Sequence, residues 1–140
     1  MPRSPHRAAL PAPYDALHAA LAEVLPAARL VTDPLRLLAW GTDASFYRLV
    51  PKIVAVVASE AELVRLLQLC AQHGTPVTFR AAGTSLSGQA VSDSVLVLLT
   101  DDWQRCAPAA DGATITLQPG VIGAVANRSL ARFGRKIGPD

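Results

Sequence analysis

The sequence is poor in charged residues, in aromatic residues and in cysteine, and each shortage excludes a class of protein. Charged residues make up 17% of the 140 residues, aromatic residues make up 5%, and the formal net charge is +2. Because the 13 basic residues are scattered rather than interleaved with aromatic ones, no nucleic-acid surface is expected. Cys70 and Cys106 stand far apart and the three histidines have no ligand spacing, so we expect neither a disulfide framework nor a metal site.

Long hydrophobic runs are also absent. No run approaches the roughly 20 apolar residues that a membrane-spanning helix needs. Residues 1–13 contain Arg3 and Arg7 but no apolar segment of the kind found in secretory signals. We therefore expect no transmembrane segment, and a location in the cytoplasm or at the cytoplasmic face of a membrane. Because its prolines and arginines offer little to bury, this segment is predicted to form a disordered tail.

The sequence does contain enough hydrophobic side chains for a core, since they make up 51% of the residues. Apolar residues at intervals of three or four predict a helix that begins at Tyr14 and that Pro26 ends. Asp33 followed by Pro34 is typical of a capped helix start and predicts a second, short helix. Residues 14–50 are thus assigned to N-terminal helices and a loop.

A capped helix follows the first strongly apolar run. Ser59 and Glu62 have the spacing of a capping box, which predicts a helix over residues 60–73. Gly74 is the residue expected just after its C-terminus. One face of this helix is apolar and is predicted to enter the core. It comprises Leu63, Leu66, Leu67 and Cys70.

Three short apolar runs predict the strands of a parallel sheet. They are Ile53–Val57, Val77–Phe79 and Val95–Leu99. With the helix between them, the first two runs predict a strand–helix–strand unit with parallel strands. The alternating segment Thr114–Leu117 predicts a half-buried strand in which Ile115 and Leu117 face inward. The predicted fold class is α+β, a small parallel sheet flanked by helices over residues 60–73 and 121–133.

The most informative stretch is the loop after the second strand, residues 80–89, which reads R-A-A-G-T-S-L-S-G-Q. Its small residues allow a ligand to approach closely, and successive N–H groups in such a loop can converge on an anion. Gly83 and Gly88 have the spacing of a Walker A loop, but Gln89 and Ala90 stand where that motif needs lysine and a hydroxyl residue. A Rossmann glycine fingerprint is absent too. From composition alone, the loop is either a diphosphate site or a tight turn that binds nothing.

Several motifs in a fixed order give the chain a family resemblance. The segment P-V-T-F-R-A-A-G-T-S-L-S-G-Q (Pro76–Gln89) resembles the diphosphate loop of PCMH-type, or vanillyl-alcohol-oxidase-like, FAD-binding domains. Pro51–Gly74 and L-Q-P-G-V (Leu117–Val121) are similar to that family in order and spacing. G-T-D-A-S-F-Y-R-L-V-P-K (Gly41–Lys52) and F-G-R-K-I-G-P-D (Phe133–Asp140) resemble one branch, the D-lactate and D-2-hydroxyacid dehydrogenases that join an FAD domain to a C-terminal iron–sulfur domain.

This resemblance, which covers roughly residues 33–140, implies that FAD is the cofactor. It assigns FAD contacts to the loop, to a later turn and to the last residues: Arg80, Ala81, Ala82, Gly83, Thr84, Ser85, Gly88, Gln89, Gly120, Pro139 and Asp140. Many relatives have glycine at the positions of Ala81 and Ala82. The N–H donors survive that change, but positive φ angles become less accessible.

The resemblance further implies an enzyme that is larger than this chain. Residues 51–140 would be the first part of a PCMH-type FAD domain, incomplete at its C-terminus. The parent would be a flavin-dependent dehydrogenase of D-lactate or another small 2-hydroxy acid. An electron acceptor of the respiratory chain is compatible with such an enzyme. Its catalytic residues and iron–sulfur cluster are expected beyond Asp140. We therefore assign no catalytic residue and no metal ligand in this chain, and expect the chain alone to be inactive.

Two further alternatives stay open. The chain can instead be a stand-alone or split nucleotide-binding module without catalysis, and a reading frame that continues past codon 140 would favour the enzyme. The loop before the first parallel strand also has two interpretations. Its polar residues either lie near the substrate or flavin, or belong to a loop that the Asp43 side chain ties down by hydrogen bonds. These residues are Asp43, Ser45, Tyr47 and Arg48.

Overall fold

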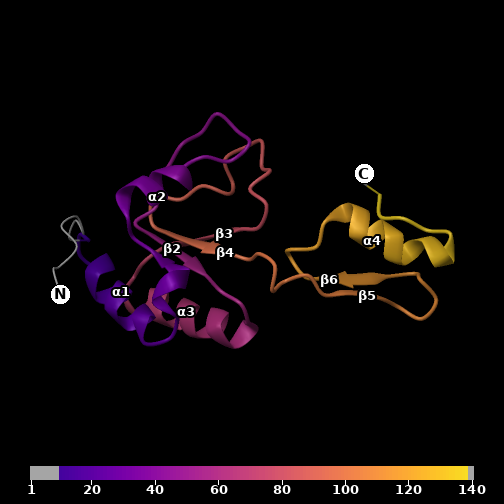
Figure 1. Ribbon diagram of the computed structural model, residues 1–140, viewed down its shortest axis with the longest axis horizontal. Helices are drawn as coiled ribbons and strands as arrows, with labels where there is room; N and C mark the ends of the chain where they lie inside the picture. Colours follow the sequence, from indigo (N-terminus) through magenta and orange to yellow (C-terminus); the bar gives the residue numbers. More distant parts are fainter. Residues whose placement is uncertain (1–9, 139–140) are drawn as a thin grey trace.

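The computed structural model describes residues 10–138, which form the elements labelled in Figure 1. The helices are α1 (Tyr14–Ala22), α2 (Pro34–Ala39), α3 (Glu60–Gln72) and α4 (Gly123–Leu130), with the short 3-10 helices η1 (Ala27–Arg29) and η2 (Ala131–Phe133). The strands are β1 (Leu30–Val31), β2 (Ile53–Val56), β3 (Val77–Arg80), β4 (Val95–Leu98), β5 (Cys106–Pro108) and β6 (Ile115–Leu117). Every helix in this part of the chain falls short of the length and apolarity that a membrane crossing requires. The tail predicted to be disordered lies, over residues 1–9, outside the described residues.

The main sheet has four strands in the order β1-β2-β4-β3, with β1 antiparallel and the other three parallel to one another. All three predicted parallel strands form. However, β4 lies between β2 and β3, so the strand–helix–strand unit joins parallel strands that are not neighbours. Burial explains this order, because every residue of β4 is buried, whereas Phe79 of β3 is 45% exposed. A strand buried on both faces belongs in the interior of a sheet, and a half-exposed strand belongs at its edge.

Successive residues of the parallel strands enter two hydrophobic clusters on opposite faces of the sheet. On one face, Ile53 packs with residues of α1 and α3, among them Leu17 and Leu66. On the other face, Val54 packs with Leu37 of α2. Figure 1 shows the same layers, with α1 and α3 on one side of the sheet and α2 on the other. The predicted α+β fold with a small parallel sheet flanked by helices is confirmed.

Local signals in the sequence set the limits of α3. The hydroxyl of Ser59 accepts the N–H of the third helical residue at 3.3 Å, and Gly74 follows the helix with a φ of +63°. Of the predicted core face, Leu66 and Cys70 are buried and Leu63 is partly buried. Leu67 is 38% exposed, and Leu69 is buried in its place. The core-facing stripe follows spacings of three and four from Leu66, and a residue one position along the helix is rotated by about 100° away from it.

The strands β5 and β6 form an antiparallel ribbon, against which α4 packs. In Figure 1 this ribbon and α4 form a second lobe that extends from the four-stranded sheet. The helix predicted over residues 121–133 therefore forms, but it flanks the ribbon rather than the parallel sheet. The predicted inward position of Leu117 is wrong, since its side chain is 37% exposed. A two-stranded ribbon covered by one short helix cannot enclose this position.

Candidate functional site

The loop of residues 80–90, here called the glycine loop, leaves the C-terminal end of β3 and is held in shape by one hydroxyl group. Ser85 Oγ accepts hydrogen bonds from the backbone N–H groups of Ser87 (3.2 Å) and Gln89 (3.1 Å). The same hydroxyl donates to Oε1 of Gln89 at 2.6 Å. The second half of the glycine loop is therefore closed on itself, and Ser85 and Gln89 serve its shape.

Two glycines of this loop have backbone conformations that other residues rarely adopt. Gly83 has a φ of +71° and Gly88 a φ of +72°, both in the left-handed region. Each glycine also lies directly against a side chain. A Cβ atom on Gly88 would lie 2.8 Å from the Tyr47 ring, and one on Gly83 would overlap the guanidinium group of Arg80. Both positions therefore require glycine for conformation. At Gly88 the Tyr47 ring also restricts the space, whereas at Gly83 the neighbouring group is the end of the flexible Arg80 side chain.

The Arg80 side chain is bonded to the chain itself. Its Nη1 donates to the carbonyl groups of Thr42 (2.7 Å) and Ala90 (3.4 Å), and the guanidinium lies 5.3 Å from the centre of the Trp40 ring. Arg80 thus connects both ends of the glycine loop to the N-terminal part of the chain. Its side chain supports the loop and is not among the residues that line the pocket described below. Its buried Nε has no hydrogen-bond partner within residues 10–138.

The loop of residues 41–48, here called the N-terminal loop, packs along the glycine loop through Asp43. One carboxylate oxygen of Asp43 accepts the N–H (2.9 Å) and the hydroxyl (2.5 Å) of Ser45, and the other accepts the N–H of Ala90 (3.3 Å). The hydrogen bond from the Ser45 hydroxyl holds the pKa of Asp43 below its ordinary value. Of the two interpretations of the N-terminal loop, the geometry supports the loop tied down by Asp43.

A pocket of about 550 Å³ opens between the glycine loop and the turn that precedes α4. It is lined by Ala81, Ala82, Thr84, Leu99, Thr100, Asp101, Gln104, Pro119, Gly120, Val121, Ile122 and Gly123. The turn at Gly120 is fixed by a hydrogen bond from the Gly120 N–H to the carbonyl of Trp103 at 2.8 Å. A Cβ atom there would lie 2.5 Å from the carbonyl oxygen of Thr100 and 2.7 Å from that of Trp103. Both obstacles are backbone atoms, so only glycine fits.

The chemistry of this pocket fits a diphosphate. Ala81, Ala82 and Thr84 line it, and within residues 10–138 their backbone N–H groups have no hydrogen-bond partner. Successive N–H groups of a loop can bind an anion without a cation beside them. No Lys or Arg side chain is among the described lining residues, so the donors beside these N–H groups are the side chains of Thr84, Thr100 and Gln104. Gln104 donates to the carboxylate of Asp101, which also lines the pocket, at 3.3 Å. Such a donor set suits the diphosphate of FAD.

The predicted FAD residues fall into three groups in the structure. Those that line the pocket are Ala81, Ala82, Thr84 and Gly120. Those that shape the glycine loop are Arg80, Gly83, Ser85, Gly88 and Gln89. Pro139 and Asp140 lie outside the described residues. Sequence reasoning missed Thr100, Gln104 and Ile122 in the pocket wall, because no motif marks residues that only the folded chain brings there.

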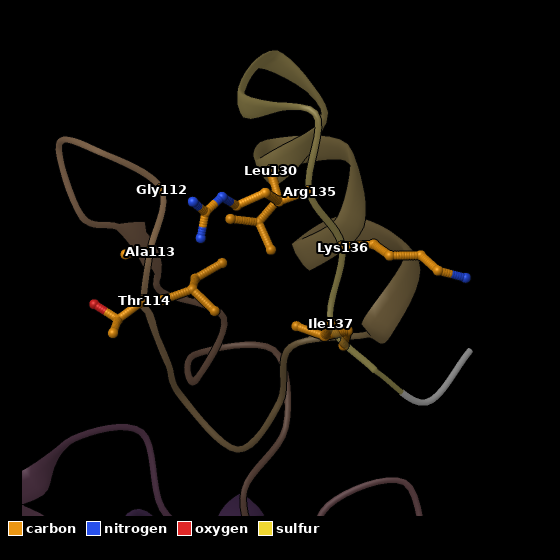
Figure 2. Close-up of a pocket in the computed structure, with 8 residues that line it drawn as sticks. Gly112, Ala113, Thr114, Leu130, Arg135, Lys136 and Ile137 are labelled. Atoms are coloured by element: carbon orange, nitrogen blue, oxygen red, sulfur yellow. The ribbon is translucent and has the colours of Figure 1, made fainter.

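A second pocket, of about 530 Å³, lies on the lobe formed by the ribbon and α4. Figure 2 shows it between the turn that carries Gly112, Ala113 and Thr114 and the segment of residues 135–137. Arg135 extends toward the turn, whereas Lys136 points away from the pocket. Its lining includes none of the residues predicted to bind FAD, so it is separate from the glycine-loop pocket.

Comparisons with known proteins identify a family and a fold. Residues 51–140 match the model of a family described as "FAD binding domain". An alkyldihydroxyacetonephosphate synthase superposes with a TM-score of 0.73 at 18% identity, over 96% of this chain and 28% of that one. For a p-cresol methylhydroxylase the TM-score is 0.69 at 10% identity, over 86% and 25%. For a chitooligosaccharide oxidase it is 0.60 at 23% identity, over 85% and 26%.

No curated protein matches the sequence of the chain. The solved structures are less than 25% identical to it, so they establish the likeness of the fold. The chain spans only between 25% and 28% of the length of these three proteins.

Proposed function

The chain belongs to the FAD binding domain family and has the PCMH-type fold, and from this premise we propose that the glycine loop and the turn at Gly120 bind the diphosphate of FAD. FAD is the cofactor of this family. The observation that carries the proposal is the pocket where Ala81, Ala82 and Thr84 have backbone N–H groups without a partner in the described part of the chain. Bound FAD supplies an acceptor for two electrons from a substrate.

In this proposal the predicted site residues have different tasks. The N–H groups of Ala81, Ala82 and Thr84 donate to the phosphate oxygens, and Gly120 forms the opposite wall of the pocket. Supporting residues keep the donors in place by fixing the loop. They are Arg80, Gly83, Ser85, Gly88 and Gln89. Pro139 and Asp140 are proposed to begin a segment that leads to the flavin ring.

For the whole protein, we propose a flavin-dependent dehydrogenase of D-lactate or another D-2-hydroxy acid. Residues 51–140 would be the first part of its FAD domain, preceded by the helices and loop of residues 14–50. Support comes from the resemblance of Gly41–Lys52 and Phe133–Asp140 to that branch, and from the small share of the solved structures that the chain spans. The same proposal includes an iron–sulfur domain later in the chain, a respiratory electron acceptor, and a place in the cytoplasm or at the inner face of the membrane.

Substrate specificity tests this proposal. A protein that carries this chain within a complete FAD domain is loaded with FAD and mixed, without oxygen, with D-lactate, L-lactate, and both enantiomers of 2-hydroxyglutarate. The absorbance of the flavin reports its reduction. We expect at least one D enantiomer to bleach the flavin, and both L enantiomers to leave it oxidised.

The other outcomes separate the remaining alternatives. Reduction by an alcohol, a sugar or a phenol, but by no 2-hydroxy acid, would keep the flavin oxidoreductase and overturn its D-2-hydroxyacid specificity. Stoichiometric FAD that no substrate of these classes reduces would favour a nucleotide-binding module without catalysis. Failure to bind FAD at all would overturn the assignment of the glycine loop.

A further inference from the structure

Ala90, the last residue of the glycine loop, is held by charged side chains on both of its backbone polar groups. Its N–H donates to the carboxylate of Asp43 at 3.3 Å, and its carbonyl accepts from the guanidinium of Arg80 at 3.4 Å. The same guanidinium donates to the carbonyl of Thr42 at 2.7 Å. Because Arg80 is the first residue of the loop and Ala90 the last, these bonds fix the two ends of the glycine loop relative to each other.

The carboxylate of Asp43 is itself fixed in orientation. One oxygen accepts two hydrogen bonds from Ser45, and the other accepts the Ala90 N–H. A further backbone bond, from the N–H of Ala44 to the carbonyl of Gly83 at 3.1 Å, ties the N-terminal loop to the middle of the glycine loop. Asp43 therefore holds the glycine loop at its last residue, Ala90, and the neighbouring Ala44 holds it at Gly83.

We propose that Asp43 is a positioning residue of the FAD site, which sets the glycine loop in its binding conformation through Ala90. The inference rests on the proposed role of the glycine loop. Asp43 does not line the pocket and is not expected to touch FAD. A loop whose donors are already in place loses less conformational freedom when it binds, so the bond to Ala90 raises affinity without any contact of its own. The chemical class recognised is the diphosphate of a dinucleotide.

Asp43→Asn isolates this bond. Asparagine keeps the shape of aspartate and one carbonyl oxygen, which can still accept from Ser45. The amide has a single acceptor oxygen for two backbone N–H groups, and while that oxygen serves Ser45 at 2.9 Å the NH₂ group faces Ala90 and cannot accept its N–H. The matched control is Asp33→Asn, the same substitution at the N-cap of α2. The Asp33 side chain accepts the N–H of Arg36 at 3.0 Å, and asparagine caps a helix as well as aspartate does.

Two measurements distinguish this inference from the proposed function. The first is amide exchange without FAD, in which Asp43→Asn should speed exchange at Ala90 and across the glycine loop by about tenfold, the effect of roughly one lost hydrogen bond. The second is the dissociation constant of FAD, measured on the chain within a complete FAD domain, which should rise by about tenfold for the same reason. Asp33→Asn should change neither value by more than about twofold.

Each result decides the matter. Faster loop exchange with unchanged FAD affinity would overturn the positioning role while leaving the diphosphate site intact. Unchanged exchange at Ala90 would overturn the bond from which the inference starts. Equal losses of affinity in both variants, with a lowered melting temperature in both, would show a general loss of stability and overturn it too. If the unsubstituted protein does not bind FAD, the proposed function fails together with this inference.

Discussion

At the residue scale, the candidate site depends on a glycine that leaves no room for any side chain. A Cβ atom on Gly120 would lie within 2.7 Å of two backbone carbonyl oxygens, those of Thr100 and Trp103. Gly123 lines the same pocket, yet a Cβ atom there would meet only the Ile137 side chain, at the ordinary contact distance of 3.6 Å. Alanine therefore does not fit at position 120 without a backbone shift, whereas it fits at position 123, and the two substitutions can be compared directly.

Gly120→Ala should move the turn that forms one wall of the pocket. Because backbone atoms must shift, we expect the free energy of unfolding to fall by about 1–3 kcal/mol and FAD affinity to fall by about tenfold or more, equivalent to roughly 1.4 kcal/mol. Gly123→Ala should be neutral or stabilising by up to about 1 kcal/mol, because Gly123 begins α4 and alanine favours a helix. Urea unfolding and FAD titration of both variants measure this difference. Equal effects of the two substitutions would contradict the assigned shape of the turn.

At the element scale, one ion pair joins the segment before β1 to the start of α3. The guanidinium of Arg29 donates two hydrogen bonds of 2.7 Å to the two carboxylate oxygens of Glu62. Glu62 also accepts the N–H of Ala58 at 2.8 Å, one residue before the Ser59 cap. The capping box is thus half made, since the Glu62 side chain bonds Ala58 and Arg29 rather than the N–H of Ser59. Arg29, by these hydrogen bonds, lowers the pKa of Glu62.

This lowered pKa makes the contribution of Glu62 dependent on pH. Because the folded pKa lies below the unfolded value of about 4.3, the stabilisation is complete above that value and is lost as pH falls through the folded pKa. Glu62→Gln should lower the free energy of unfolding by about 1–2 kcal/mol near neutral pH. Urea unfolding should show this difference from the unsubstituted chain shrinking below about pH 4. Glu60→Gln, in the same helical turn, is the control and should show little change. A difference independent of pH would refute the ion pair.

The sequence predicts elements better than it predicts how they meet. The Ser59 cap, the Gly74 end and the strands are set by neighbouring residues, so local patterns reveal them. The position of β4 between β2 and β3 depends on burial across the whole sheet, which no local pattern contains. The same holds for the site. The glycine loop is visible in the sequence, but the bond from Asp43 to Ala90 spans 47 positions and exists only in the folded chain.

At the scale of the whole molecule, the candidate pocket lies where the two lobes meet. The indole N–H of Trp103, just after the main sheet, donates to the carbonyl of Val57 at 2.7 Å and holds this connection against β2. One wall of the pocket comes from the glycine loop of the first lobe, and the other from the turn at Gly120 that leads into the second. Binding at this pocket therefore requires that both lobes keep their relative positions.

The 140 residues alone are expected to bind FAD weakly. Each N–H donor contributes only about 0.5–1.5 kcal/mol after water is displaced, whereas association costs an estimated 4–15 kcal/mol. The three N–H donors of the pocket therefore offset at most the low end of that cost. In the proposed larger protein, burial of the isoalloxazine and adenine rings on further surfaces would supply the rest. Flavin fluorescence should show no saturation at FAD concentrations of about 1 μM. Micromolar affinity of the 140-residue chain would contradict this expectation.

In the proposed FAD site, the N–H groups of Ala81, Ala82 and Thr84 hold the diphosphate. Residue-by-residue amide exchange, with and without FAD, measures this contact in a chain that continues through the rest of an FAD domain. We predict that FAD slows exchange at these three residues, while the Gln89 amide, which already bonds within the glycine loop, changes little. Protection that appears instead at the second pocket, around residues 112–115, with Ala81, Ala82 and Thr84 unchanged, would contradict the assignment.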